Sequence, residues 1–291
     1  MLLLSELTKI FRIYNLSPKK FLGQHFLIDK NIQKKIISIC QLSPKDIVLE
    51  IGPGLGALTE EICKRVSFVY AVEKDATLCK ILKERLIYFK NLEIINSDIL
   101  KFSLPPAGCS SSVRLKVIGN LPYYISTPIL NYLIENQEYI DSVFISLQKE
   151  LVERIVARPG GKEYGALTVF VNFYTKPQIV FPIKRTCFFP KPEVDSYFLR
   201  IEFIQQPIAN KELEKLFFQI VHTAFQKRRK TILNALSESK LGFKKEILEE
   251  ILRISNIPFQ RRPETLSIDD FINLAKQLYR INLGIKSYLQ R

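Results

Sequence analysis

The chain has 291 residues, 47% of them hydrophobic, which is enough for two domains that each bury a core without disulfide staples. The net charge of +14 favours a polyanionic partner, either nucleic acid or an acidic membrane surface, while no apolar run reaches the roughly 18 residues that a membrane span requires. Five widely spaced cysteines without a C-x-x-C pair argue against a zinc site or a disulfide framework and indicate a reducing, cytoplasmic compartment.

The N-terminal segment MLLLSELTKIFRIYN opens with only four apolar residues, too few for the apolar core of a signal peptide. An amphipathic transit peptide would share its spacing. Leu4, Leu7, Ile10 and Phe11 repeat at helical intervals, which predicts a short helix packed on the first domain. We therefore expect a soluble protein.

Five short runs rich in β-branched residues alternate with longer helical patterns between residues 46 and 158. The strand-like runs are DIVLEI, FVYAVE, LEIINSD, RLKVIGN and SVFISLQ. Repeated units of this length predict an α/β fold, a parallel sheet with helices on both faces, because each parallel crossover needs about a dozen residues or more. Ligands of such sheets bind at the carboxyl ends of the strands, near the point where the strand order reverses.

Two further β runs, PQIVFPI and VDSYFLRIEFI, are expected to form an antiparallel hairpin at the sheet edge, with the loop KRTCFFPKPE between them. Beyond Ile204 the strand pattern ends and four segments with helical periodicity follow. We therefore predict a catalytic domain over residues 1–204 and a helical domain over 205–291. Residues 200–291 carry a surplus of 7 positive charges in 92 residues, against 7 in the preceding 199, so the helical domain is the stronger candidate for binding a polyanion.

A glycine-rich turn, VLEIGPGLG at residues 48–56, follows the first strand and precedes a helix. Gly52, Gly54 and Ala57 satisfy G-x-G-x-x-A, and Glu73 lies 21 residues after Gly52 at the end of the next strand, where an acid can accept hydrogen bonds from both ribose hydroxyls. A tight turn without a ligand is the simpler alternative. The pattern favours a nucleoside cofactor but leaves a nicotinamide dinucleotide and S-adenosylmethionine both open.

Acidic residues at the strand ends help to separate the two cofactors. Asp98 ends the third strand, where it is either a capping residue or an acceptor for the exocyclic amine of the cofactor's adenine. Together with Glu50 and Glu73 it would disfavour a pyrophosphate and suit a cationic sulfonium compound. The electrostatics therefore favour S-adenosylmethionine, and the two histidines, His25 and His222, show no metal-ligand spacing, so we expect no metal.

The stretch VIGNLPYYIS at residues 117–126 begins as a buried strand that must end near Gly119, because a proline cannot donate a hydrogen bond within a sheet. The amide oxygen of Asn120 and a backbone carbonyl of Leu121 or Pro122 could accept both N–H groups of an adenine amine. Such contacts would aim its lone pair at a methyl group and stabilise the charge that develops there. A rigid turn that packs tyrosines is the alternative.

A target base would also need aromatic support, since stacking on an aromatic ring returns about 1–3 kcal/mol per base. Tyr123 offers one ring, and Phe188 or Phe189 in the loop KRTCFFPKPE offers a second. The phenylalanine pair could equally be a hydrophobic plug between the sheet and the helical domain.

These motifs match a known family. In order along the chain they are SPKKFLGQHFLID (17–29), VLEIGPGLGALT (48–59), VEKD (72–75), NSDIL (96–100), NLPYYISTPIL (120–130), FFPKPEVDS (188–196) and TAFQKRRKTILNAL (223–236). Nearly end to end, the chain resembles the small-subunit ribosomal RNA adenine N6-dimethyltransferases, whose relatives include the erythromycin-resistance methylases of large-subunit RNA. The glycine turn alone is a weak signal, whereas seven motifs in this order are very specific.

The resemblance implies a Rossmann-like methyltransferase sheet of seven mostly parallel strands, with a small all-helical C-terminal domain. It implies dimethylation of two adjacent adenosines in the 3′-terminal hairpin of 16S-type RNA during assembly of the 30S subunit, by a monomer without metal or membrane. The family positions that contact S-adenosylmethionine match His25, Leu27, Gly52, Glu73, Asp98 and Asn120, and the catalytic positions match Asn120, Leu121, Pro122, Tyr123 and Phe188.

Two positions depart from the family pattern, because many members have Asn where this chain has His25 and Tyr124. Alternatives of other classes are a non-catalytic RNA-binding assembly factor and a nicotinamide oxidoreductase, and an adenine N6-methylase of large-subunit RNA is a related enzyme. The basic run KRRK at 227–230 and the pair Arg261 and Arg262 are candidates for phosphate contacts, or else belong to a solvated helix face.

Overall fold

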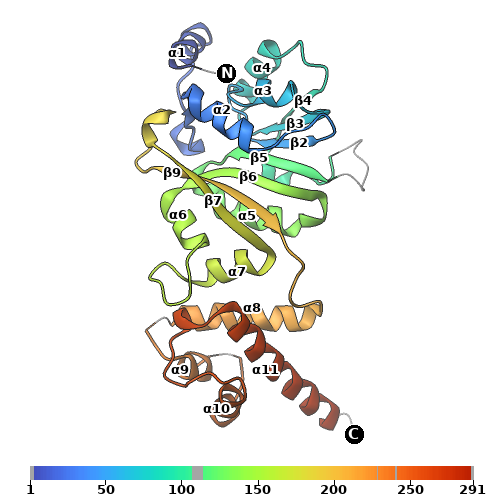
Figure 1. The fold of residues 1–291 in the computed structure, drawn as a ribbon, viewed down its shortest axis with the longest axis vertical. Coiled ribbons are helices and arrows are strands. Elements are labelled where there is room, and N and C mark those ends of the chain that lie inside the picture. The colour runs from blue at the N-terminus through green and yellow to red at the C-terminus, as the bar shows by residue number, and fades with distance from the viewer. Residues whose placement is uncertain (1–2, 107–113, 228, 240, 290–291) are drawn as a thin grey trace. The chain divides into compact units, whose positions relative to one another are not determined.

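A seven-stranded sheet with the strand order β4-β3-β2-β5-β6-β9-β7 lies at the centre of the N-terminal unit (Figure 1). The computed structural model describes residues 3–106, 114–227, 229–239 and 241–289. Strands β2 to β6 pair in parallel and β9 pairs antiparallel with β6, so the expected seven-stranded, mostly parallel sheet is confirmed. The strands are β2 (Ile47–Ile51), β3 (Phe68–Glu73), β4 (Leu92–Asn96), β5 (Leu115–Asn120), β6 (Ile140–Gln148), β7 (Thr175–Ile183) and β9 (Ser196–Phe203).

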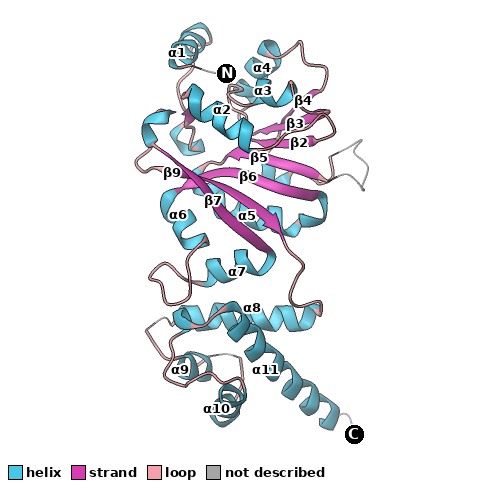
Figure 2. Ribbon diagram, viewed as in Figure 1, coloured by secondary structure: helices cyan, strands magenta, loops and turns pink. Residues whose placement is uncertain are grey.

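Helices precede or follow the parallel strands along the chain, as Figure 2 shows. α2 (Lys30–Ile39) precedes β2, and α3 (Thr59–Cys63), α4 (Ala76–Arg85), α5 (Ser126–Glu135) and α6 (Lys149–Ile155) follow β2, β3, β5 and β6. Two of them begin at aspartates: the carboxylate of Asp29 accepts hydrogen bonds from the first turn of α2, and that of Asp75 accepts one from Thr77 at the start of α4. Each cap satisfies N–H groups that have no partner inside the helix.

The order of the strands reverses between β2 and β5. The chain proceeds outward from β2 to β3 and β4 and then returns to place β5 on the other side of β2, where Ile51 lies opposite Gly119. Helices that leave two neighbouring strands in opposite directions open a crevice at the carboxyl ends of those strands. Both the glycine turn after β2 and the Asn-Leu-Pro-Tyr loop after β5 begin at this crevice.

The N-terminal helix α1 (Leu4–Ile13) packs on this unit, as its periodicity predicts. Leu7 and Ile10 are buried in a cluster with Phe26 and Leu55. Phe26 belongs to a second, two-stranded sheet, in which β1 (Phe26–Leu27) pairs antiparallel with β8 (Phe188–Phe189). This small sheet joins the SPKKFLGQHFLID and FFPKPEVDS motifs, which are about 160 residues apart in the sequence.

The second compact unit contains Ile204–Arg291 together with Glu153–Thr175, whereas the sequence pattern predicts a single boundary after residue 204. Phe173 stacks on Phe217 with ring centroids 4.7 Å apart, and Tyr174 donates a 2.5 Å hydrogen bond to Glu214. These contacts explain why residues 153–175 group with the C-terminal helices. The helices of the second unit are α7 (Ala166–Tyr174) from this segment and the C-terminal helices α8 (Lys211–Gln226), α9 (Ile232–Ser237), α10 (Lys245–Ile254) and α11 (Ile268–Leu289).

The C-terminal segment is helical, as expected. α8 contacts α9 and α11, and α10 contacts both of those helices as well. Buried side chains from each helix, among them Phe217, Leu236, Leu252 and Phe271, fill the space between them. Among the residues that the structure describes, no helix has the length and apolar character needed to cross a bilayer.

Gly119 is required by the close approach of β2 and β5. A Cβ atom at this position would lie 2.9 Å from the Ile51 carbonyl oxygen and 3.0 Å from the Leu121 side chain. We predict that Gly119→Ala lowers the free energy of unfolding by about 1–3 kcal/mol, because the strands must separate to admit the methyl group. Urea unfolding measures the loss. Gly165→Ala is the control, since a Cβ there meets nothing within 4 Å; equal stabilities of both variants would contradict the prediction.

Candidate functional site

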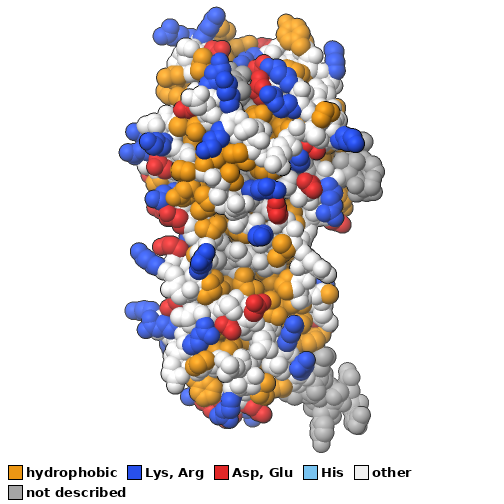
Figure 3. Space-filling model, viewed as in Figure 1, with side chains coloured by type: hydrophobic (Ala, Val, Ile, Leu, Met, Phe, Trp, Pro, Cys, Tyr) orange, Lys and Arg blue, Asp and Glu red, His pale blue; other side chains and the backbone are white. Residues whose placement is uncertain are grey.

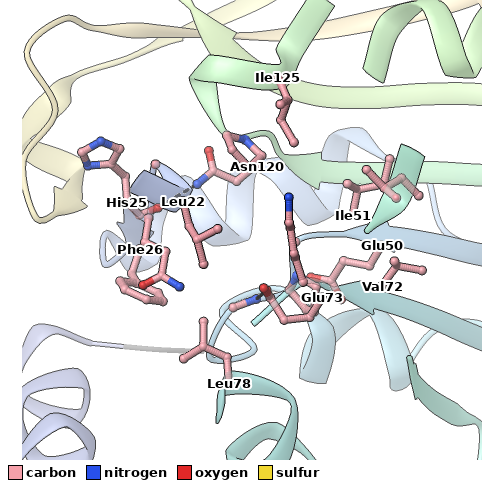
Figure 4. A pocket seen from close by; sticks show the side chains of 18 of the residues that line it. Leu22, His25, Phe26, Glu50, Ile51, Val72, Glu73, Leu78, Asn120 and Ile125 are labelled. Atoms are coloured by element: carbon pink, nitrogen blue, oxygen red, sulfur yellow. Dashed lines mark hydrogen bonds between the residues drawn. The ribbon is translucent and has the colours of Figure 1, made fainter. Parts of the chain in front are cut away.

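A cavity opens at the carboxyl ends of β2, β3 and β5, where the strand order reverses (Figure 4). Its walls come from the segment around β1, the glycine turn, the residues after β3 and β4, and the loop after β5. Seven of the residues singled out from the sequence line it together: His25, Leu27, Gly52, Glu73, Asp98, Asn120 and Pro122. The structure thus gathers residues that are spread over about 100 positions into one site.

The glycine turn leaves its backbone open to the cavity. Gly52 and Gly54 have φ values of +68° and +57°, a region that side chains disfavour, and a Cβ at Gly54 would lie 3.3 Å from the Phe26 ring. The Gly52 N–H donates to the Val72 carbonyl at 2.9 Å, which ties the turn to β3. A ligand can therefore approach the main chain here without meeting side chains.

Glu73 ends β3 and organises the turn. Its two carboxylate oxygens accept hydrogen bonds from the Gly54 N–H at 3.0 Å and the Asp75 N–H at 2.9 Å. Burial raises the pKa of Glu73, although these two N–H groups oppose the rise. Each oxygen has a further lone pair, so the carboxylate can accept hydroxyl groups of a ligand as well.

Glu50 is a second buried acid in the cavity wall. It is only 2% exposed, and its Oε2 atom has no hydrogen-bond partner within the described residues. Burial, reinforced by the nearby Glu73 carboxylate, raises the pKa of Glu50 to about 8. The group therefore carries a proton at neutral pH, and a cationic ligand would favour its ionised form. In Figure 4, Glu50 and Glu73 lie on the opposite side of the site from Leu22 and His25.

Asp98 follows β4, where it caps a short turn and lines the cavity. It caps the short 3₁₀ turn Ile99–Lys101 through the Leu100 N–H at 3.1 Å, and its carboxylate faces the cavity. Burial opposes its ionisation, but the Lys74 ammonium at 2.9 Å and the Leu100 N–H outweigh burial and lower the pKa of the carboxyl. Asp98 is thus held as an anion just beyond the carboxyl end of β4, the strand at one edge of the sheet.

Asn120 ends β5, and its amide is held at both ends. Nδ2 donates to the His25 carbonyl at 2.9 Å, and Oδ1 accepts a hydrogen bond from the hydroxyl of Ser146 at the end of β6. His25 is fixed in turn, because its Nδ1–H donates to the Pro190 carbonyl at 2.7 Å. The His25 segment, β5 and β6 are therefore joined around one amide group.

Leu121, Tyr123 and Phe188 do not line the cavity but contact residues that do. Tyr123 stacks on the His25 ring with centroids 5.4 Å apart and bonds the Ser196 hydroxyl at 2.9 Å. Phe188 is 3% exposed and lies opposite Leu27 in the small sheet. Leu121 is buried, and its N–H donates to the Ser146 carbonyl at 3.3 Å.

Ser146, Ser196, Lys74 and Tyr124 are residues of the site that the sequence reading did not assign. Ser146 stands at the carboxyl end of a parallel strand, so the rule that ligands bind at such ends could have identified it. Ser196 lies within the FFPKPEVDS motif, but nothing local links it to Tyr123. Tyr124 lines the cavity with 49% of its surface exposed, and Gly23 lies against its ring.

The basic residues proposed to contact phosphates are partly engaged inside the second unit. Lys227 and Lys230 both bond Glu238, at 2.9 Å and 2.5 Å, and Arg261 bonds Asp270 at 3.2 Å. Arg228 lies outside the described residues, whereas Arg229 and Arg262 are exposed. On the face shown in Figure 3, Lys and Arg side chains are spread over the surface with acidic side chains between them.

Comparison of the sequence with known proteins finds a match to the family model of ribosomal RNA adenine dimethylases over residues 15–278. The ribosomal RNA small subunit methyltransferase A of Alkaliphilus oremlandii is 43% identical over 276 residues, covering 93% of this chain and 96% of that protein. The protein of the same name from Moorella thermoacetica is also 43% identical and covers 92% and 95% of the two chains.

Comparison of the fold with solved structures finds RNA methyltransferases among the matches. The crystal structure of a dimethyladenosine transferase from Plasmodium falciparum aligns with a TM-score of 0.73 at 26% identity, covering 86% of this chain and 95% of that one. The 23S rRNA methyltransferase ErmE aligns with a TM-score of 0.68, also at 26% identity, covering 87% and 99%.

The raised pKa of Glu50 makes stability depend on pH. Between the ordinary carboxyl pKa of 4.5 and about 8 the folded state binds a proton that the unfolded state releases, so this group makes stability fall as pH rises through that window. We predict that the stability of Glu50→Gln changes less over this pH range. From pH 5 to pH 8.5, the free energy of unfolding of the unsubstituted protein should fall by on the order of a few kcal/mol more than that of Glu50→Gln.

Urea unfolding at the two pH values measures this difference. Because the Glu50 and Glu73 carboxylates influence each other's ionisation, the difference reports on the coupled pair. The exposed Glu93→Gln is the control and should leave the difference between the two pH values unchanged. An identical pH dependence for Glu50→Gln and the unsubstituted protein would show that Glu50 is ionised in the folded state.

Proposed function

Because this chain belongs to the ribosomal RNA adenine dimethylase family, we propose that it transfers methyl groups from S-adenosylmethionine to N6 of two adjacent adenosines in the 3′-terminal hairpin of small-subunit ribosomal RNA. The relatives at 43% identity are named for the small subunit, which supports that RNA over large-subunit RNA. The immature 30S subunit is the proposed partner, with the enzyme acting as a cytoplasmic monomer.

The observation that carries this proposal is the position of Asn120 beside an acid-lined cavity. An amide oxygen and the adjoining backbone lie at the end of β5, directly across the strand-order reversal from the glycine turn. Methyl transfer to an amine requires the nucleophile and the donor to meet in line within a short distance. A non-catalytic RNA-binding protein would have no need for acceptors placed at this point.

S-adenosylmethionine fits the residues that line the cavity. The Oε2 atom of Glu50, which has no partner in the part of the chain that the structure describes, and the carboxylates of Glu73 and Asp98 suit a ligand with a positive charge and several N–H and O–H donors. When bound, the cofactor supplies an electrophilic methyl group on a sulfonium sulfur. We assign Glu73 to the ribose hydroxyls and Asp98 to the adenine amine.

The remaining cofactor contacts come from the main chain near the glycine turn and β1. Gly52 leaves room for the ligand against the backbone, and His25 and Leu27 border the opposite wall. We assign Asn120 to the boundary between the cofactor and the target base. No metal takes part in this proposal.

Two acceptors would hold the target amine. Oδ1 of Asn120 has one lone pair engaged by Ser146 and a second that remains for an N–H group. The Pro122 carbonyl already accepts from the Ser126 hydroxyl at 3.0 Å and the Ile125 N–H at 3.3 Å, so we assign the second acceptor to the Leu121 carbonyl. These dipoles favour a pyramidal nitrogen and stabilise the positive charge that forms on it.

Tyr123 and Phe188 are proposed to support the target base. One face of Tyr123 lies against His25, so the base would stack on the other face. Phe188 is 3% exposed, and its use as a second ring requires the loop that follows it to open when RNA binds. Pro122, which precedes Tyr123, fixes the direction in which the tyrosine leaves the strand.

The decisive experiment transfers labelled methyl groups from S-adenosylmethionine to three substrates: unmethylated small subunits, protein-free small-subunit RNA and large-subunit RNA. The modified nucleotide is then mapped. We expect dimethyladenosine in the small-subunit RNA, and Asn120→Ala, which should transfer methyl groups far more slowly, serves as the control. Methylation confined to large-subunit RNA would assign the related activity instead, and binding of NAD without any response to S-adenosylmethionine would overturn the proposal altogether.

Tyr123→Ala should lower turnover about 100-fold or more while cofactor affinity stays within about twofold, because the lost ring supports the base rather than the cofactor. Turnover is measured with the RNA substrate and affinity by calorimetry with S-adenosylmethionine. Tyr123→Phe keeps the ring and loses only the bond to Ser196, so it should retain most of the activity. Equal losses of turnover and cofactor affinity in Tyr123→Ala would contradict the assignment.

A further inference from the structure

Ser146 holds the Asn-Leu-Pro-Tyr loop through two separate bonds. It lies near the end of β6, opposite Asn120 in the parallel register of β5 and β6, and is 3% exposed. Its carbonyl accepts the Leu121 N–H at 3.3 Å, and its hydroxyl donates to Asn120 Oδ1. The first bond belongs to the backbone and survives any substitution, whereas the second depends on the serine side chain.

The Ser146 hydroxyl lies in a buried part of the sheet, because β6 has neighbouring strands on both sides. A buried hydroxyl without a hydrogen-bond partner is unfavourable by roughly 1–3 kcal/mol, so an alanine would be more stable here if the hydroxyl were unpaired. Asn120 Oδ1 is the partner that the hydroxyl needs.

The two bonds to the Asn120 amide act on opposite ends of the group. Nδ2 donates to the His25 carbonyl at 2.9 Å, and Oδ1 receives the Ser146 hydroxyl. A rotated amide would turn its oxygen toward the His25 carbonyl, where two acceptors would face each other. With both ends anchored, the plane of the amide is set, and so is the direction of the lone pair that Ser146 leaves unused.

We propose that Ser146 is a positioning residue for methyl transfer: it occupies one lone pair of Asn120 Oδ1 and thereby aims the other at the N–H of the target amine. This inference rests on the proposed function, because it assumes that Asn120 receives that amine. Ser146 does not line the cavity assigned to the cofactor, and we assign it no contact with the base. Its effect is therefore on the rate of transfer and not on the affinity for S-adenosylmethionine.

The test compares Ser146→Ala with the unsubstituted protein. We expect kcat to fall about tenfold, the loss typical of one hydrogen bond near a reacting group, while the KM for RNA and the calorimetric affinity for S-adenosylmethionine change by less than about twofold. Ser146→Thr keeps a hydroxyl and should recover activity. Ser142→Ala is the matched control, a buried serine on the same strand whose hydroxyl bonds Asp141 at 3.0 Å, and it should leave kcat unchanged.

A double-mutant cycle separates positioning from a general structural effect. In single-turnover assays, Ser146→Ala should cause no further loss in an Asn120→Ala background, since the group that it orients is already absent. An equal loss in both backgrounds would overturn the proposal. An unchanged kcat in Ser146→Ala would also overturn it.

Nuclear magnetic resonance of the side-chain amide of Asn120 gives a readout that does not depend on activity. In the protein without cofactor, Ser146→Ala should shift and broaden the Asn120 Nδ2 signals as the amide gains freedom to rotate, and Ser142→Ala should not. Unaltered Nδ2 signals in Ser146→Ala would count against the proposal. If the unsubstituted protein methylates no RNA, the proposed function fails by itself, and the amide signals still decide whether Ser146 orients Asn120.

Discussion

The structure depends on the close contact between the ends of β2 and β5. The Ile51 carbonyl and Gly119 approach so closely that a methyl group would not fit between them, and this contact places the glycine turn and the Asn120 loop side by side. A nucleoside cofactor and an amine acceptor need that proximity, because the two reacting groups must meet in line. The strand order that brings β5 back beside β2 is thus the condition for any transfer chemistry in this cavity.

The electrostatics of the cavity follow from how its acids are partnered. Glu73 is bound by backbone N–H groups, Asp98 is paired with Lys74, and Glu50 is buried with one oxygen unpartnered within the described residues. Burial raises the pKa of Glu50 to about 8 and also raises that of Glu73, so the cavity contains fewer charges near neutral pH than its composition implies. A cationic ligand would supply the missing countercharge, which links its affinity to the release of that proton.

Local sequence patterns predicted most of the fold and part of the candidate site. Alternating strands and helices, the glycine turn and the acids at strand ends are encoded in short segments, and the sheet brought them together as parallel topology requires. The environments of Tyr123 and Phe188 could not be predicted from such patterns, because the residues that they contact, His25, Ser196 and Leu27, are far away in sequence. For the same reason the grouping of residues 153–175 with the C-terminal helices could not be foreseen: it arises from aromatic rings that meet only in the folded chain.

The salt bridges within the second unit limit the affinity with which its lysines can bind a polyanion. Lys227 and Lys230 already share the carboxylate of Glu238, so a phosphate that reaches them exchanges one anionic partner for another. Such an exchange gains less free energy than pairing with unengaged cations and displaces fewer condensed counterions from the nucleic acid. A polyanion bound in this way would dissociate more readily than one bound by unengaged cations.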